Sequence, residues 1–424
     1  MKLPTALLAA CTAITAVATP ADSTDTGALL RRIGAATAPV ARFEQEAFIP
    51  NPASMFYLMP FSLSDFRISG SIADSDEAAV VQQGTGHAMA SVSASSYLRM
   101  NSSAVVWGAA DFTTGRRRDI MWNNAADYTL VAPYTLADSV GGNLSLRSYS
   151  FSGGYSGKAR RWTWGAEASY RAEIDYRNRD PRDKTVVSDL QVRAGATLLA
   201  ARRYIIGAGA DLRVYNQESD VDFYNPNNDI RTYLLTGLGN TYARFSGNSS
   251  RNTAYKGIGY GAVVQLIPAS DKGFSLSARL GKLRITQVLR DYNNLDLTRS
   301  DTYTLSLRSS YILRTGAVTT GAMLTAEMSR RPGYENIFGT SVGSNYTKIG
   351  TRRNYLHDLA EVTLAVPVSL DASETVKLHL LPAVSGCYSH EDYRRPARAL
   401  EASSVTPSVE AKLTWKALPT VTWG

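Results

Sequence analysis

The chain has 424 residues, a formal net charge of +8 and only 19% charged residues, together with 32 Gly and 23 Tyr. Lys and Arg are spread along the chain instead of being concentrated on one segment, which argues against a nucleic-acid-binding protein. Apolar residues are dispersed as well, which argues against a soluble α/β enzyme, and one large β-barrel can accommodate a chain of this length.

Residues 1–21 predict a secretory signal peptide. Lys2 is followed by an apolar stretch from Leu3 to Ala18 and then by small and acidic residues, the order found in the leaders of exported proteins. The residues around Cys11 also match a lipoprotein box, so lipidation of Cys11 remains an alternative to simple cleavage. Without the leader Cys387 is the single cysteine, and no internal disulfide can form.

Residues 22–62 form a separate segment before the first predicted strand. Pro50 and Pro60 interrupt any regular element there, and Asn51-Pro52-Ala53-Ser54-Met55-Phe56 lies between them. A segment of this length can fold into the mouth of a barrel as a plug, or it can remain a periplasmic tail.

Residues 63–424 alternate between apolar and polar side chains. From Trp162 to Tyr176 the even positions are apolar or aromatic, and the odd positions are polar, charged or Gly. Side chains of a membrane-spanning strand alternate in this way between lipid and lumen, and closure of the barrel pairs every backbone group. The aromatic ends of the run are typical of interfacial girdles. No stretch of the mature chain has about eighteen consecutive apolar residues, which excludes helical membrane spans.

These patterns predict an all-β fold, a transmembrane antiparallel β-barrel of about fourteen strands, with twelve or sixteen as alternatives. The predicted strands are 64–74, 87–99, 102–113, 143–155, 160–177, 185–200, 203–216, 254–267, 273–287, 301–313, 317–330, 356–368, 374–388 and 404–417. Longer connections alternate with tight turns. Bacterial barrels have short periplasmic turns and an even number of strands, so we expect the outer membrane of a Gram-negative bacterium, with both termini in the periplasm.

The parity of the strands places many charged residues on the inner face. The candidates that line the lumen are Glu167, Arg171, Glu173, Asp189, Arg193, Asp211, Arg213, Arg279, Arg308, Glu327, Glu361, Lys377, Glu410 and Lys412. Acids and bases are nearly balanced, whereas a pore that selects one ion sign would show an excess of one charge. The set is interpreted as a cross-strand network, with Arg193 paired to Asp211, and a path for a polar solute remains the alternative.

The longest connection, 217–253, contains candidates for ligand recognition. Tyr224, Tyr242 and Arg244 stand there among Asn and Asp residues, a composition that suits sugars, peptides or another protein. Any solvated loop has a similar composition, so a purely structural role remains the alternative.

No pattern of catalytic residues is present. The four histidines are not spaced as metal ligands, no Ser stands at a strand-to-helix elbow, and no Gly-rich phosphate loop precedes a helix. We therefore expect no enzymatic activity, no cofactor and no metal site.

The stretch Asn51-Pro52-Ala53 after an exported leader, followed by fourteen-strand spacing and by Tyr- and Arg-rich loops, resembles an uncharacterised family of outer-membrane barrels of Bacteroidota-type bacteria, a domain of unknown function. The chain is also distantly similar to the long-chain fatty-acid transporter superfamily, whose barrels carry an N-terminal hatch with a related Asn-Pro-Ala. The resemblance implies the location and the fold and assigns no function.

Two functional hypotheses follow from the sequence. The first is a barrel that passively transports or binds small solutes, with outer-membrane lipid and the barrel assembly machinery as its other partners. The second is a structural or accessory barrel of a secretion or surface complex, which would act on a surface protein through its extracellular loops. Neither involves nucleic acid.

Overall fold

The computed structural model describes residues 10–18, 39–225, 231–246, 252–270, 272–342, 345–371 and 376–415. The remainder of the predicted leader, residues 1–9 and 19–21, lies outside these ranges, as do residues 22–38 of the predicted N-terminal segment.

Most of the described residues belong to β-strands. The strands are β1 (Ala10–Ala18), β2 (Leu63–Asp74), β3 (Gly86–Asn101), β4 (Ala104–Ile120), β5 (Thr135–Asp138), β6 (Gly142–Ala159), β7 (Trp162–Tyr176), β8 (Arg182–Ala200), β9 (Tyr204–Asp222), β10 (Thr232–Gly237), β11 (Asn240–Thr241), β12 (Asn252–Pro268), β13 (Gly273–Leu289), β14 (Leu295–Thr315), β15 (Val318–Val342), β16 (Asn345–Ala365), β17 (Val368–Asp371), β18 (Val376–Tyr393) and β19 (Arg398–Trp415). The helices are α2 (Pro39–Glu46), α3 (Tyr128–Val131) and the 3-10 turns η1 (Ser54–Tyr57) and η2 (Arg290–Tyr292).

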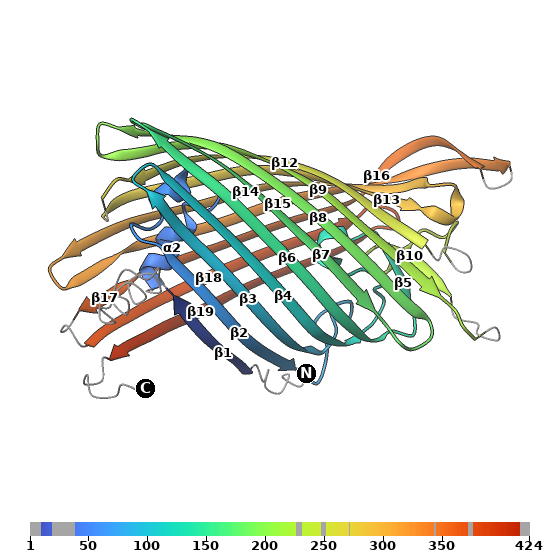
Figure 1. Ribbon diagram of the computed structural model, residues 1–424. Coiled ribbons are helices and arrows are strands. Elements are labelled where there is room, and N and C mark those ends of the chain that lie inside the picture. The colour runs from blue at the N-terminus through green and yellow to red at the C-terminus, as the bar shows by residue number, and fades with distance from the viewer. Residues whose placement is uncertain are drawn as a thin grey trace.

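The long strands pair with their neighbours in chain order and curl into a barrel-like wall (Figure 1). Every strand pair within the described ranges is antiparallel, from β1 with β2 to β18 with β19. When β1 and the four-residue β17 are set aside, fourteen strands of this 16-stranded sheet remain. The predicted all-β, antiparallel fold is confirmed. The concave side of the wall is called the lumen below.

The wall is not closed, which corrects the prediction of a closed barrel. The outer edge of β2 is occupied by β1, with Ala18 opposite Ser64 and Ala10 opposite Ile72. β19 pairs with β18, and within the described ranges no strand pairs with its other edge. The physical reason lies at the gap between β2 and β19, called the seam below. There β1, which falls in the predicted leader, occupies the edge of β2 that a closing strand would need.

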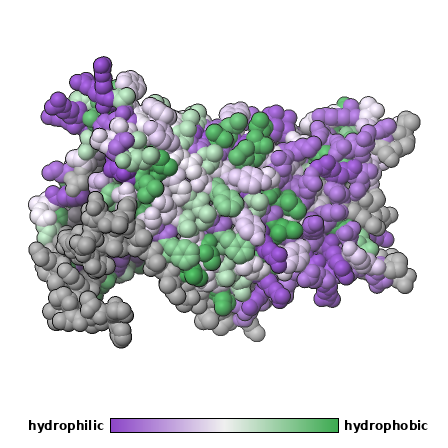
Figure 2. All heavy atoms as spheres, viewed as in Figure 1, coloured by the Kyte–Doolittle hydropathy of each residue, from purple (hydrophilic) through white to green (hydrophobic). Residues whose placement is uncertain are grey.

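The outer surface of the wall is apolar across its middle. Large side chains at alternate positions point outward and are exposed, among them Ile68, Ile206 and Leu280. Apolar residues gather over the middle of the strands in Figure 2, whereas hydrophilic residues dominate the end near β5 and β10. On β14 the outward aromatic residues Tyr303 and Tyr311 stand eight positions apart, which corresponds to about 27 Å along a strand.

The two ends of the wall differ in their connections. One end, called the turn end, carries short turns such as 160–161 and 201–203, and the other, called the loop end, carries the longer connections. Two connections that were expected to be long loops are extended hairpins instead: β15 and β16 pair as far as Val342 and Asn345, and β18 and β19 pair as far as Tyr393 and Arg398. Backbone pairing continues there beyond the apolar alternation on which the sequence assignment relied.

The seam generates a first prediction. After removal of residues 1–21, we expect β2 and β19 to pair with each other, because both are end strands of an even set and therefore run antiparallel. Ile68 and Val409 both face outward. In a Cys387→Ser background, Ile68→Cys should form a disulfide with a cysteine introduced at Val405, Val409 or Leu413, since paired residues lie within disulfide reach.

The matched control is Ile68→Cys with Leu280→Cys, another outward position on a distant strand. Electrophoresis of membrane-inserted protein under non-reducing conditions reads out both pairs. If none of the three β19 positions cross-links with Ile68 in the processed chain, closure by β2 and β19 is wrong.

Candidate solute site in the lumen

Residues 39–59, called the plug below, lie in the lumen at the turn end (Figure 1). Asn51 is fully buried and holds the plug to the wall through its side chain. Its Nδ2 donates to the backbone oxygens of Ala196, at 3.4 Å, and Ala208, at 3.3 Å. Its Oδ1 accepts from the backbone N–H of Ala53 at 3.0 Å, which forms an Asx turn.

Glycines of the inner wall make room for this turn. A Cβ added at Gly195 would lie 2.1 Å from Asn51 Oδ1, and one added at Gly165 would lie 2.5 Å from the backbone carbon of Pro52. Both distances are far below contact, so these two wall positions require glycine for the backbone and the plug to approach so closely.

Further hydrogen bonds connect the plug to several strands. Ser54 Oγ donates to Gln265 at 2.6 Å, and Tyr97 OH donates to the backbone oxygen of Met55 at 2.8 Å. Arg99 donates to the backbone oxygen of Phe56 at 2.7 Å. Because these partners belong to β3 and β12, the plug bridges opposite parts of the wall.

A small separate β-sheet occupies the lumen at the loop end. β5, β10 and β11 form a separate three-stranded sheet, called the inner sheet below. Leu136 of β5 and Leu234 of β10 pack in a buried cluster with wall residues such as Leu289. The connection before β5 is held by Asp127, which accepts hydrogen bonds from Arg171 and, at 3.0 Å, from Tyr215 OH.

Ion pairs link the inner faces of β4, β7, β8, β9 and β13. This wall network consists of Arg117 with Asp175 at 3.0 Å, Arg171 with Glu173 at 2.8 Å, Arg193 with Glu167 at 2.6 Å, Arg213 with Asp189 at 2.7 Å and Arg279 with Asp211 at 2.9 Å. Each base therefore has an acid beside it, and this half of the lumen is electrostatically compensated.

One predicted pair is replaced. Arg193 and Asp211 do stand opposite each other in the register of β8 and β9, yet they do not form the expected ion pair. Arg193 also donates to the backbone oxygen of Ile49 in the plug at 3.0 Å, and both carboxylate oxygens of Asp211 accept from Arg279. Arg193 is instead engaged by Glu167 on β7 and by the plug, and Asp211 is engaged by Arg279 on β13.

The other inward candidates lie farther along the wall. Arg308 pairs with Glu46 of the plug at 2.7 Å, and Glu361 stands 3.8 Å from the Sγ atom of Cys387. Lys377 on β18 is paired in register with Thr414, and on β19 Glu410 and Lys412 are paired with Leu381 and His379. These last three flank the seam.

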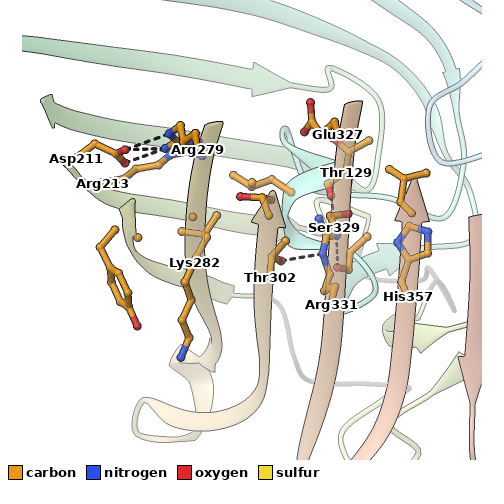
Figure 3. Close-up of a pocket in the computed structure, with 18 of the residues that line it drawn as sticks. Thr129, Asp211, Arg213, Arg279, Lys282, Thr302, Glu327, Ser329, Arg331 and His357 are labelled. Atoms are coloured by element: carbon orange, nitrogen blue, oxygen red, sulfur yellow. Dashed lines mark hydrogen bonds and ion pairs between the residues drawn. The ribbon is translucent and has the colours of Figure 1, made fainter. Parts of the chain in front are cut away.

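A polar cavity of about 540 Å³ lies between α3 and strands β9 and β12 to β16 (Figure 3). Charged residues on its lining include Asp211, Arg213, Arg279, Glu327 and Arg331. Figure 3 shows Lys282 pointing away from this group. Several predicted lumen residues, among them Asp211, Arg213 and Glu327, converge on this cavity.

Arg331 is the cavity residue that the sequence analysis missed. The predicted strand ended at residue 330, so Arg331 was assigned to a connection. In the structure β15 continues to Val342, and Arg331 has the same inward parity as Glu327. Continued alternation past residue 330 was the available signal, but it is weak there because Pro332 and Gly333 follow directly.

The three loop candidates have different surroundings. Tyr242 donates to the backbone oxygen of Asn336 at 2.5 Å, and burial raises the pKa of Tyr242 to about 12. Arg244 donates to the backbone oxygens of Phe338 and Gly339. Both residues hold their loop against β15, whereas Tyr224 is 61% exposed and stacks with Arg182 at 4.0 Å.

The described residues contain neither a membrane-spanning helix nor a metal-binding cluster. No helix there is both long and apolar enough to cross a membrane. No group of three or more His, Cys, Asp or Glu residues there is arranged to hold a metal ion. Near the loop end, Cys387 and Glu391 alternate along β18 with His390 and Asp392, so these four residues point to opposite faces.

Comparison with known families identifies a relationship. The sequence model of a family of unknown function, DUF6850, matches residues 52–422. The chain belongs to this family. No curated protein matches this DUF6850 chain at a significant level.

Solved structures are only distantly similar to this DUF6850 protein. The ferric citrate transporter FecA, unliganded, has 10% identity and a TM-score of 0.33 over 78% of this chain and 60% of that one. The siderophore receptor PirA from Acinetobacter baumannii has 10% identity and a TM-score of 0.37 over 83% and 70%. This chain therefore spans 60% of the length of FecA.

These comparisons support neither the predicted similarity to fatty-acid transporters nor the predicted origin from Bacteroidota-type bacteria. Neither structure is a fatty-acid transporter, and the family match names no bacterial group. The fatty-acid analogy would also require an apolar lumen pocket, whereas Arg213, Arg279 and Arg331 line the cavity observed.

The fit between plug and wall generates a second prediction. Gly195→Leu should displace the turn at Asn51, because overpacking of this kind costs about 1–3 kcal/mol. Amide hydrogen exchange in residues 47–58 should then be roughly 5- to 150-fold faster, as measured by mass spectrometry of the purified full chain.

Ala196→Leu is the matched control, since it adds a side chain at the adjacent, exposed position on the other face of β8. It should leave exchange in the plug unchanged. Equal protection of residues 47–58 in both variants would show that the plug does not depend on the glycine at position 195.

Proposed function

We propose that this chain is an integral outer-membrane barrel. The exposed apolar middle of the wall, with outward aromatic residues such as Tyr303 and Tyr311 near its two margins, supports this proposal. Such a band fits the hydrocarbon layer, which in bacterial barrels is about 25 Å tall and flanked by aromatic girdles. In this arrangement outer-membrane lipid covers the wall, the turn end faces the periplasm, and the barrel assembly machinery inserts the chain.

The function that the geometry supports best is passage or binding of a small polar solute in the lumen. The observation that carries it is the cavity of about 540 Å³ between α3 and the inner faces of β9 and β12 to β16. Ligand sites in proteins commonly occupy concave spaces of about 300–1,000 Å³ with a few convergent polar groups. We propose no coupled energy source and no enzymatic step.

A second function is favoured by a different observation. The plug and the inner sheet occupy both ends of the lumen, and the wall network leaves little uncompensated charge across it. A lumen that stays closed would fit a structural or accessory barrel of a surface complex. Exposed Tyr224 at the loop end would then be a candidate contact for a protein partner.

Single-channel recording separates the two functions. We expect the processed chain in planar bilayers to show low or intermittent conductance, and the chain lacking residues 22–62 to show steady conductance, because the plug bridges the wall at the turn end. The conductance of Gly195→Leu should lie between that of the processed chain and that of the deletion variant. The conductance of Ala196→Leu should equal that of the processed chain.

Folding of each protein is checked by its heat-modifiable migration on electrophoresis, so that an unfolded deletion is not mistaken for a closed one. A folded deletion variant without any conductance would overturn the solute path and favour the accessory barrel.

A further inference from the structure

We propose that the β15 side of the cavity binds a small zwitterion that carries a carboxylate and an ammonium group, such as a free α-amino acid. Its carboxylate contacts Arg331 and its ammonium contacts Glu327. This inference rests on the proposed solute-binding lumen and specifies the substrate class of that site.

Arg331 is a positioned cation, and no carboxylate of the described residues lies within ion-pair distance of it, although Glu391 is near enough to interact with it electrostatically. Its Nε donates to Thr302 Oγ1 at 3.0 Å, and its Nη1 donates to the backbone oxygens of Thr129 and Ala132, both at 2.8 Å. These three bonds fix the guanidinium plane at the cavity (Figure 3). No ion pair with Arg331 and no acceptor for its Nη2 occurs among the residues that the structure describes. A guanidinium held in this way leaves the two N–H groups of Nη2 to donate charge-assisted hydrogen bonds to a carboxylate.

Glu327 supplies the opposite charge on the same strand. It lines the same cavity, and within the described ranges no hydrogen bond or ion pair involves its carboxylate. Its neighbours in register are Ser306 on β14 and Glu361 on β16, which adds a second acid beside it. The acidic position is therefore suited to an ammonium group.

The spacing of the two charges fits one small molecule. Glu327, Ser329 and Arg331 project from the same face of β15 in Figure 3, and alternate residues lie about 6.6 Å apart along a strand. Long Glu and Arg side chains can converge over Ser329 from about 13 Å between their Cα atoms. The Ser329 hydroxyl lies between them and also lines the cavity.

Other charges at the cavity are already engaged. Arg279 is bonded to Asp211, and Arg213 to Asp189. His357, opposite Arg331 in register, bonds through Nε2 to Ser389 Oγ at 2.9 Å, and Glu391 lies next to His357. Glu391 interacts electrostatically with Arg331, but no ion pair joins the two among the described residues. The Nη2 of Arg331 and the carboxylate of Glu327 therefore remain without a direct protein partner there, which favours a zwitterion over a simple anion or cation.

Three matched probes test the inference by isothermal titration calorimetry with the purified full chain. L-Alanine has both groups, propionate lacks the ammonium and ethylamine lacks the carboxylate. L-Alanine should bind at least about tenfold more tightly than either analogue, because each charged contact contributes a charge-assisted hydrogen bond.

Two variants assign the contacts. Glu327→Gln should weaken the binding of L-alanine by about tenfold or more and leave the binding of propionate unchanged. Arg331→Gln should weaken the binding of both ligands. Arg330→Gln is the matched control, because residue 330 lies on the other face of β15 and its guanidinium stands near Asp358. Ser329→Ala, a smaller change at the same face, tests the site if Arg331→Gln alters the fold.

The outcomes are distinct from those of the conductance experiment. Propionate binding as tight as that of L-alanine and insensitive to Glu327→Gln would reduce the site to an anion site and overturn the inference. Absence of L-alanine binding in a chain that conducts without residues 22–62 would overturn it while the proposed solute path stands.

Discussion

The constraint on which the structure depends is that every backbone N–H and C=O of the wall must be paired while its outer surface remains apolar. Consecutive antiparallel pairing from β2 to β19 meets the first requirement except at the outer edge of β19, which no described strand pairs. Alternation along the strands meets the second requirement. Because the outward positions are reserved for apolar side chains, the polar residues of the strands are confined to the lumen. The plug, the inner sheet and the charged lining can therefore be understood as ways of filling and pairing that inner face.

How much of the fold could be predicted follows from this alternation. The predicted strand 203–216 overlaps β9 and starts one residue before its first residue, Tyr204. At the loop end the predicted strands end too early. Strands such as β15 continue there as hairpins that lack a regular apolar alternation, and the inner sheet covers part of them. Hydrogen bonding between strands persists there without an apolar periodicity. Arg331 lies in that interval, so the sequence analysis did not find the residue on which the zwitterion site depends.

The sequence predicted on which face of the wall the charged side chains of the candidate site lie, but not which of them form ion pairs. Parity placed Arg193 and Asp211 on the inner face, and the register brings them opposite each other. Their partners were decided by groups far away in sequence, since Ile49 of the plug competes for Arg193 and Arg279 competes for Asp211. The same limit applies to Gly195. Its small size is visible in the sequence, but 144 positions separate it from Asn51, and nothing local links the two.

The distribution of charge around the lumen has a functional consequence. From β4 to β13 the wall network couples the strands, and β9 contributes both an acid and a base to it. Charge-paired side chains of this kind stiffen the wall but offer little to a solute, which would have to replace an existing partner. Across β14, β15 and β16 the register instead aligns Ser306, Glu327 and Glu361 in one row. Arg331 and His357 form another row four residues away along the strands, where Arg331 also bonds to Thr302. Glu327 and Arg331 do not pair with each other directly, whereas a bound dipolar molecule can contact both. The asymmetry between the two halves of the lumen is thus the physical reason to place solute recognition on β15.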